Sequence, residues 1–373
     1  MKVTLKQSTK KAGVFVCALL TAVSLFAFAA CVRDDDTPPP TNQNAYTREG
    51  LAEKFLAKAD GEVTVNETTV TVKDESGADS VTIPKNPQKV YNLYASFTTL
   101  WYEAGGTVSG LIGGASSSDL YIEQIGRDVS KDDGVKVVAT SSAGSRWSPE
   151  TIVADQPDLI ICSTAMSGYS TIKSPAQSAG IPVLAMSYDG FEDYFKWFKV
   201  FCNLTGKPEL WDSVAKDTLN KVTDILMRVP LENNPSVFLM FTAAGNDLQA
   251  NLSGTVVGDM AKQLRATNIA DAWFNNDQAI RLPINLESVY LSQPDFIMVQ
   301  CHAESVDAEA QVAEQYGPDS DNGAVWSALN AVKANRISYL QRSLFHNKPN
   351  RKFADAYLIM AEILYPDTDF QTE

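Results

Sequence analysis

Two glutamates occupy the same place in two copies of one sequence pattern. The copies span residues 148–161 and 285–298, and each reads Glu, a short apolar stretch, Gln-Pro-Asp and a longer apolar run. Glu150 and Glu287 could each form a charge-assisted pair with a cationic group of a partner that touches both copies at once. Either glutamate alone could equally do no more than complement a helix dipole.

Each copy predicts a short helix, a sharp turn and a buried strand. Ser148 and Asn285 suit the N-cap position, and an acid two residues later suits the positive end of a helix. The proline takes its predecessor out of helix geometry, and a continuous apolar run behind it is typical of a strand buried on both faces. The glutamates lie 137 residues apart, a period too long for a solenoid. The pattern therefore predicts two α/β lobes built on one plan.

Sequence motifs for catalysis and for metal binding are missing. The chain contains no GxSxG elbow, P-loop, dinucleotide-binding glycine pattern or HExxH. Its two histidines, His302 and His346, cannot form the His-rich cluster of a zinc or manganese binder. A secreted hydrolase that uses one of them as a base with a cleft serine stays open as an alternative, although no spacing pairs such residues.

The first 30 residues predict a signal peptide, because four lysines precede an apolar run over residues 12–30. Phe28-Ala29-Ala30-Cys31 then resembles the lipobox of bacterial lipoproteins, which would make Cys31 the acylated residue. Phe28 stands where that motif usually has Leu, so ordinary cleavage to a secreted protein stays open. An uncleaved anchor also stays open, because the apolar run approaches membrane-spanning length. Residues 32–44 are rich in Asp and Pro and predict a flexible tether.

The chain is acidic, with 31 basic and 45 acidic residues and a net charge of −14. The signal peptide carries four of the lysines and no acid, so the remainder has a net charge of −18. Such a surface disfavours nucleic acid and anionic lipid head groups as partners. Cys162, Cys202 and Cys301 lack CxxC spacing and predict buried thiols.

Strand and helix signals alternate in both halves of the chain and predict a mainly parallel sheet in each lobe. No strand signal interrupts residues 191–230. They predict a helix over 191–204 that ends at Thr205-Gly206 and a second helix opened by Pro208, which together make a rigid connection between the lobes. We also expect a continuous helix over residues 326–333 and an amphipathic closing helix over 352–364. The predicted parts are a signal peptide at 1–30, the lipidated cysteine, tether and a short helix at 31–60, an N-terminal lobe at 61–190, connecting helices at 191–230, and a C-terminal lobe at 231–373.

Gly, Ser and aromatic residues cluster just behind the predicted strands, where ligands bind in parallel α/β sheets. Aromatic rings there could stack on a flat ligand, cations could meet an anionic ligand, and a histidine could bind haem iron. Lobe packing, solvated charge and a structural histidine are the alternatives. The candidates are Tyr94, Trp147, Tyr169, Tyr188, Phe345, Arg342, Lys348 and His302.

Five short segments, taken in order, resemble the substrate-binding proteins of bacterial ABC importers for iron-siderophores, haem and cobalamin. The resemblance covers roughly residues 62–366. The segments are Pro84-Lys-Asn-Pro-Gln-Lys-Val90, Ser148-Pro-Glu-Thr-Ile with the later Gln-Pro-Asp-Leu-Ile, Ser178-Ala-Gly-Ile-Pro-Val183, Leu204-Thr-Gly206 and Phe345-His-Asn-Lys-Pro-Asn-Arg-Lys-Phe-Ala354.

The resemblance implies two Rossmann-like lobes joined by a long rigid helix, a ligand cleft between them and no enzyme activity. It implies that Glu150 and Glu287 dock on arginines of a permease, which works with an ATPase. We expect a monomer without a resident cofactor or bare metal, whose ligand is a ferric siderophore, then haem, for which His302 and Met166 are possible axial ligands, then a corrinoid. A surface sensor or adhesin of the same fold is the alternative.

Overall fold

The computed structural model describes residues 47–78, 80–140, 147–232, 234–242, 248–273, 279–302 and 307–371. The chain divides into two units, Met1–Asn42 and Gln43–Glu373, and every element below belongs to the second. The predicted lipidation site Cys31 and the tether lie outside the described residues. Within the described ranges, no helix has the length and apolar character needed to cross a bilayer.

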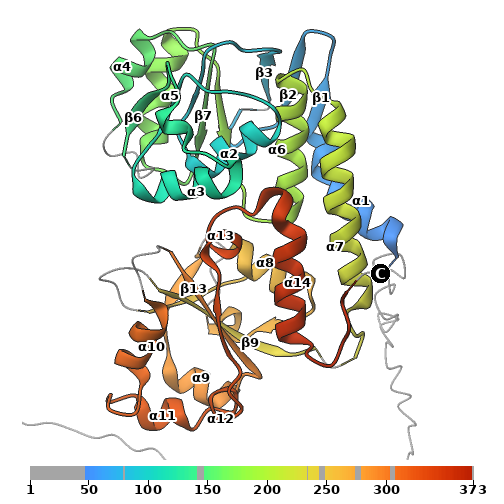
Figure 1. Ribbon diagram of the computed structural model, residues 1–373, viewed down its shortest axis with the longest axis vertical. Coiled ribbons are helices and arrows are strands. Elements are labelled where there is room, and N and C mark those ends of the chain that lie inside the picture. Colours follow the sequence, from blue (N-terminus) through green and yellow to red (C-terminus); the bar gives the residue numbers. More distant parts are fainter. Residues whose placement is uncertain are drawn as a thin grey trace, which may run out of the picture. The chain divides into compact units, whose positions relative to one another are not determined.

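A five-stranded parallel sheet forms the centre of the N-terminal lobe (Figure 1). Its order is β6-β5-β4-β7-β8. The first strand, β4, therefore lies in the middle, with β5 and β6 added on one side and β7 and β8 on the other. The strands are β4 (Val90–Asn92), β5 (Gly110–Ile112), β6 (Lys136–Ala139), β7 (Leu159–Ser163) and β8 (Val183–Met186). The connections carry α2 (Ala95–Glu103), α3 (Ala115–Ile125), the 3₁₀ turn η2 (Val129–Lys131), α4 (Pro149–Ala154) and α5 (Gly168–Ser178).

The C-terminal lobe contains a mixed sheet, with the order β12-β10-β9-β13-β14 and β11 beside β9. Strands β9, β11, β13 and β14 run parallel, whereas β10 is antiparallel to both β9 and β12. This sheet is less uniformly parallel than expected, because β10 runs antiparallel to both of its neighbours. The strands are β9 (Ser236–Thr242), β10 (Gln249–Asn251), β11 (Thr267–Asn268), β12 (Arg281–Pro283), β13 (Phe296–Cys301) and β14 (Ile337–Leu340).

Short helices cover this second sheet. They are α8 (Val256–Gln263), η4 (Ile269–Trp273), α9 (Leu286–Ser292), α10 (Ala308–Tyr316), α11 (Gly323–Ser327), α12 (Asn330–Lys333) and α13 (Arg342–Phe345). The continuous helix expected over residues 326–333 is wrong, because the chain becomes extended at Leu329 and separates α11 from α12. Leu329 is fully buried, so the break lets its side chain enter the core of the lobe.

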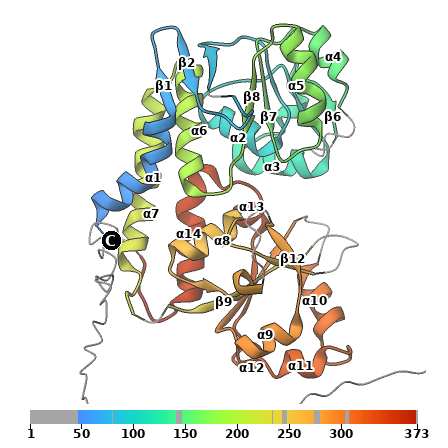
Figure 2. The same ribbon diagram turned by 180° about the vertical axis from the view of Figure 1, so that it is seen from behind.

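Four helices form the spine beside the two sheets (Figures 1 and 2). Helices α1 and α6 pack together, as do α7 and α14, and α1 also contacts α7. The members are α1 (Arg48–Glu62), α6 (Phe191–Leu204), α7 (Lys216–Arg228) with the preceding π-helical turn η3 (Trp211–Ala215), and α14 (Phe353–Leu364), which follows the 3₁₀ turn η5 (Asn350–Lys352). A small antiparallel sheet of β1 (Val63–Val65), β2 (Thr69–Val72) and β3 (Val81–Pro84) extends from α1.

The connection expected to be rigid is therefore a helical hairpin with a tight turn. Gly206 makes that turn with φ +71°, a left-handed conformation that favours glycine. A Cβ on Gly206 would also lie 2.7 Å from Oδ1 of Asn86 in the N-terminal lobe. The Asn86 N–H donates to the Leu204 carbonyl at 2.7 Å, so the turn is tied to that lobe.

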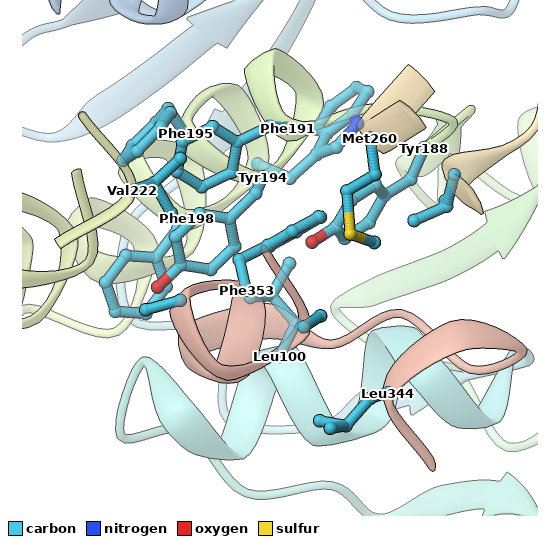
Figure 3. Close-up of a cluster of buried hydrophobic side chains, with 14 of the residues drawn as sticks. Leu100, Tyr188, Phe191, Tyr194, Phe195, Phe198, Val222, Met260, Leu344 and Phe353 are labelled. Atoms are coloured by element: carbon cyan, nitrogen blue, oxygen red, sulfur yellow. The ribbon is translucent and has the colours of Figure 1, made fainter. Parts of the chain in front are cut away.

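An aromatic cluster joins the spine to both lobes (Figure 3). Phe191, Tyr194, Phe195 and Phe198 of α6 are fully buried, and Phe353 of α14 packs on Phe191 with ring centroids 4.9 Å apart. Met260 of α8 and Leu100 of α2 belong to the same cluster. Aromatic side chains bury large apolar areas and pair with defined ring geometries. This packing explains why α6 is rich in aromatic residues along its whole length.

The two sequence copies fold alike, as predicted. Gln156 and Gln293 both adopt positive φ, 51° and 44°, which ends α4 and α9 before the proline. Asp158 then accepts hydrogen bonds from the N–H groups of Gln88 and Lys89, both at 2.8 Å. In the second copy Asp295 accepts from Ser236 N–H at 2.8 Å and from its hydroxyl at 2.7 Å. Each Gln-Pro-Asp turn thus fastens its strand to the start of the lobe's first strand.

The capping prediction was right for one copy and wrong for the other. Asn285 Oδ1 accepts from the Ser288 N–H at 3.0 Å and caps α9. Ser148 makes no such bond, because its hydroxyl lies 2.8 Å from the hydroxyl of Thr151.

Candidate functional site

Loops from both lobes enclose a cavity of about 510 Å³. The N-terminal lobe contributes residues that follow β4, β5, β7 and β8, at the carboxyl ends of those strands. This is the crevice where ligands bind in open α/β sheets. The N-terminal wall consists of Tyr94, Ala95, Ser96, Phe97, Ser116, Ser117, Leu120, Ser163, Ala165, Met166, Ser187, Tyr188 and Asp189; the C-terminal wall of Gly254, Thr255, Val256, Ile280, Arg281, Gln300, His302, Arg342, Phe345, His346, Asn347 and Lys348.

The C-terminal wall is cationic, although the whole chain is acidic. Arg281, Arg342 and Lys348 line the cavity, and Asp189 is the carboxylate among the described lining residues. A cluster of positive charge inside a partly desolvated cleft attracts anions more strongly than the same charges would on an open surface. The cavity is therefore suited to a ligand with negative charge.

Arg281 of β12 is held by a chain of hydrogen bonds. Its Nε donates to Asn251 Oδ1 at 2.9 Å, Asn251 Nδ2 donates to Gln300 Oε1 at 2.5 Å, and Gln300 Nε2 donates to the Phe345 carbonyl at 2.6 Å. The guanidinium also lies 3.8 Å from the centre of the Phe241 ring. Burial lowers the pKa of Arg281, yet an arginine stays charged in proteins. The cation is thus fixed before any ligand arrives.

Arg342 and Lys348 are the other two cations of the wall. Arg342 is only 9% exposed, and its Nε donates to the His302 carbonyl at 2.8 Å. The Lys348 ammonium lies 3.6 Å from Asp189 Oδ1 and 5.3 Å from the centre of the Tyr188 ring. Burial lowers the pKa of Lys348, and Asp189 opposes that shift.

The two histidines meet at the cavity. The rings of His302 and His346 are 5.9 Å apart, with an interplanar angle of 87°. Burial lowers the pKa of both, that of His346 to about 3, and nearby Arg342 lowers both further, so each imidazole is neutral near pH 7. The Nδ1 atoms of both are buried without a hydrogen-bond partner among the described residues. Neutral imidazole nitrogens can ligate iron, although no group of three or more His, Cys, Asp or Glu in the described ranges could hold a metal ion alone.

Aromatic side chains line the opposite wall. Tyr94 and Phe97 pack with ring centroids 4.6 Å apart, and Phe97 stacks on Tyr188 at 6.4 Å. The Tyr188 hydroxyl donates to Asn350 Oδ1 at 3.3 Å, so this ring is fixed by a residue that precedes α14. Such rings offer apolar faces to a flat or partly apolar ligand.

Six of the eight candidates from the sequence line this cavity: Tyr94, Tyr188, His302, Arg342, Phe345 and Lys348. Trp147 and Tyr169 are not among its lining residues. They pack in an apolar cluster on one face of the N-terminal sheet, with Ile152, Ile160 and Ile172. Both residues follow predicted strands, so the sequence favoured a position at the rim of the cleft. In the structure their rings pack inside the N-terminal lobe.

Sequence reasoning missed Arg281 and Gln300, and considered His346 only as a base. Arg281 lies on β12, whose three residues show no clear strand alternation, and this strand reaches the cavity only through antiparallel pairing with β10. Arg281 follows a stretch for which the sequence predicted no element, so no sequence pattern identified it as a residue of the site. His346 directly follows Phe345, and its proximity in sequence to Arg342 and Lys348 was the available signal.

Glu150 and Glu287 are exposed in the first turns of α4 and α9 and do not line this cavity. Glu150 lines a separate open hollow of about 840 Å³, together with Val137, Val138 and Thr151. The hollow lies between α4 and the edge strand β6. The two acids are thus surface groups, available to a macromolecular partner.

Residues 122–344 match the sequence profile of the family described as periplasmic binding protein. The chain is also 24% identical, over 364 residues, to an uncharacterized ABC transporter substrate-binding lipoprotein, YvrC, of Bacillus subtilis (strain 168). That alignment covers 96% of this chain and 98% of the relative.

Solved structures share the fold. The periplasmic vitamin B12 binding protein BtuF of Vibrio cholerae superposes with a TM-score of 0.58 at 16% identity, over 76% of this chain and 98% of that one. The periplasmic heme-binding protein RhuT from Roseiflexus sp. RS-1 gives a TM-score of 0.55 at 18% identity, over 75% of this chain and 99% of that one. The predicted architecture of two α/β lobes with a spine is therefore confirmed.

Proposed function

The chain belongs to the periplasmic binding protein family, and we propose that it captures an iron complex outside the cytoplasm and delivers it to the permease of an ABC importer. Its relatives are binding proteins of transporters, so the chain is a binding protein and not an enzyme. A ferric siderophore is the ligand we favour. The permease and its ATPase are the partners that such a role requires.

The charge of the cavity supports this ligand. Arg281, Arg342 and Lys348 line the cavity, and among the described lining residues Asp189 is the single carboxylate. A siderophore already saturates its iron, so the protein needs to provide only shape, stacking and complementary charge. An anionic tris-catecholate complex would find all three between the cationic wall and the rings of Tyr94 and Tyr188.

Haem is the second candidate, because His302 and His346 are neutral at the cavity and Met166 lies on the opposite wall. Any of these side chains could serve as an axial ligand to haem iron. The haem carboxylates would also suit the cationic wall. A corrinoid is the third candidate; it gains least from the three cations, and its support is the likeness to the vitamin B12 binding protein.

Titration of the purified protein with four probes, followed by tryptophan fluorescence, tests the ligand. The probes are an anionic ferric tris-catecholate complex, the cationic complex ferrioxamine B, haemin and cyanocobalamin. We expect the tris-catecholate to bind most tightly, at or below micromolar concentration, and haemin binding would instead show a shifted Soret band. Binding of a sugar, a peptide or a bare metal with none of the four probes would overturn the proposal.

Anchoring and docking complete the proposed role. Cys31 would hold the protein to the membrane through a lipid, as the lipoprotein relative suggests, and mass spectrometry of the mature N-terminus checks this: an unacylated Cys31 contradicts it. Glu150 and Glu287 would each pair with an arginine of the permease. Normal uptake by a strain lacking this chain would favour a sensor or adhesin instead.

A further inference from the structure

An exposed apolar pair stands beside one of the two surface glutamates. Tyr290 and Leu291 of α9 are 44% and 75% exposed, and Leu291 is the most exposed large hydrophobic side chain in the described ranges. Glu287, Tyr290 and Leu291 are spaced i, i+3 and i+4, so they share one face of the helix. Val289 on the other side is fully buried and anchors the helix to its lobe.

The equivalent helix of the other lobe lacks this pair. The sequence copies align Val153 with Tyr290 and Ala154 with Leu291, and both residues on α4 are small. Beside Glu150 the surface is hollowed and not raised. The two glutamates therefore stand in unlike surroundings, one next to a hollow and one next to an apolar protrusion.

Two possible occupants of the protrusion fit poorly. A second copy of the chain related by a two-fold axis would place the same patch against itself and bring the two Glu287 carboxylates together. A membrane surface with anionic head groups would be repelled by Glu287 and by the net charge of −18 that remains without the signal peptide. A protein surface with a cation next to an apolar recess meets neither objection.

We propose that Glu287, Tyr290 and Leu291 form one composite docking patch, with the permease of the importer as its occupant. The inference rests on the proposed transport function. The carboxylate pairs with a permease cation, while Leu291 and the Tyr290 ring enter an apolar recess beside that cation. Burial of the apolar pair excludes water from the ion pair and strengthens it. The C-terminal lobe then supplies most of the docking affinity, and the N-terminal lobe supplies orientation.

The test measures binding of the mature full-length protein to the permease–ATPase complex encoded with it, reconstituted in lipid nanodiscs. L291S should weaken binding about tenfold to a hundredfold, because the partner loses one buried leucine side chain. The matched control is L231S, since Leu231 is 66% exposed but lies outside α9, in the segment that follows α7; it should change binding less than twofold. Thermal unfolding and ligand affinity should be unchanged in both variants.

Other outcomes separate this inference from the function on which it rests. Absence of binding by the wild-type protein overturns both. Tight wild-type binding that E287K abolishes and L291S leaves intact overturns the composite patch alone. Binding to empty nanodiscs that is lost in L291S assigns the patch to lipid, and a wild-type dimer that L291S dissociates assigns it to self-association; either result overturns the permease as occupant.

Discussion

The two lobes share a frame but differ in what they expose. Both contain the Gln-Pro-Asp turn, the positive φ of its glutamine and an aspartate that binds the backbone at the first strand. The matching positions later in the same helices differ: on α4 Val153 is half-buried and Ala154 is exposed, whereas on α9 Tyr290 and Leu291 are both exposed. Positions that tie strands together are thus repeated, while surface positions on the same two helices differ.

The walls of the cavity differ in the same way. The N-terminal wall presents serines, aromatic rings and Asp189, whereas the C-terminal wall presents Arg281, Arg342, Lys348 and two histidines. The two walls are therefore chemically complementary. One wall provides stacking surfaces and the other provides charge.

Charge reversal of the docking acids should have the largest effect. E287K should reduce uptake about a hundredfold or more, because a lysine repels the partner's cation and leaves it unpaired. E150K should reduce uptake less, since its surroundings lack the apolar pair. The control is E309K, which changes an exposed first-turn acid of α10 and should transport normally. Equal losses for E150K and E287K in uptake of the labelled complex would show that the docking helices do not differ.

Neutralising the cationic wall should have the next largest effect. R342Q should weaken binding of an anionic ferric tris-catecholate about tenfold to a hundredfold, because a hydrogen bond to a charged group contributes about 1.5–3 kcal/mol. S116A on the opposite wall should change the dissociation constant less than threefold. Added salt should weaken wild-type binding more than R342Q binding. Identical salt dependence of the two proteins, measured by fluorescence titration, would contradict a cationic wall that selects anions.

Two titratable groups, Glu103 in the N-terminal lobe and His346 in the C-terminal lobe, should give opposite dependences of stability on pH. Burial raises the pKa of Glu103 on α2 to about 7, despite donation from the Tyr194 hydroxyl. The folded state therefore binds a proton that the unfolded state releases above pH 4.5, so this group's contribution to stability falls as pH rises from about 4.5 to 7. E103Q should remove this pH-dependent loss of unfolding free energy, which is on the order of 3 kcal/mol at pH 8. The exposed control E67Q should behave like the wild type.

His346 should give the opposite slope. Burial and the nearby cations lower its pKa to about 3, against 6.5 in the unfolded chain. The unfolded state then binds more protons between these values, so stability is lost as pH falls from about 6.5 towards 3. H346Q should flatten that part of the profile. Urea unfolding at a series of pH values measures both slopes, and a profile unchanged by either variant would exclude these groups.

The smallest effect concerns Asp155, which aligns with Ser292 in the other lobe. Asp155 accepts from Lys136 at 2.7 Å and from the Tyr91 hydroxyl, and Lys89 lies 3.1 Å away. These donors, Lys136 first, lower the pKa of Asp155, so its contribution to stability exists above pH 3.8 and is lost on further acidification. D155N should cost about 1 kcal/mol at pH 7, because the group is partly exposed. S292N should cost less; the reverse order in urea unfolding would contradict this difference between the lobes.

Much of the frame could be predicted because it depends on local sequence. The strand after each Gln-Pro-Asp and the helix over α6 follow from period, turn residues and apolar runs. The arrangement of the spine was harder to predict, because the signals that end one helix and begin the next do not fix how the two helices pack. Gly206 was predicted to end the first helix, but the position of α7 beside α14 and α1 depends on packing between segments far apart in sequence.

The sequence by itself determined the two-lobed plan, the repeated glutamates and the absence of catalytic motifs, because each is encoded in contiguous residues. The tertiary structure alone decided which side chains meet at the cavity. Trp147 and Tyr169 turn into the core of their lobe, whereas Arg281 reaches the cavity through a strand pairing between residues far apart in sequence. The charge of the cavity has the same origin. Three cations come together only when β12, α13 and the segment before α14 pack in space, and no pattern along the chain records that proximity.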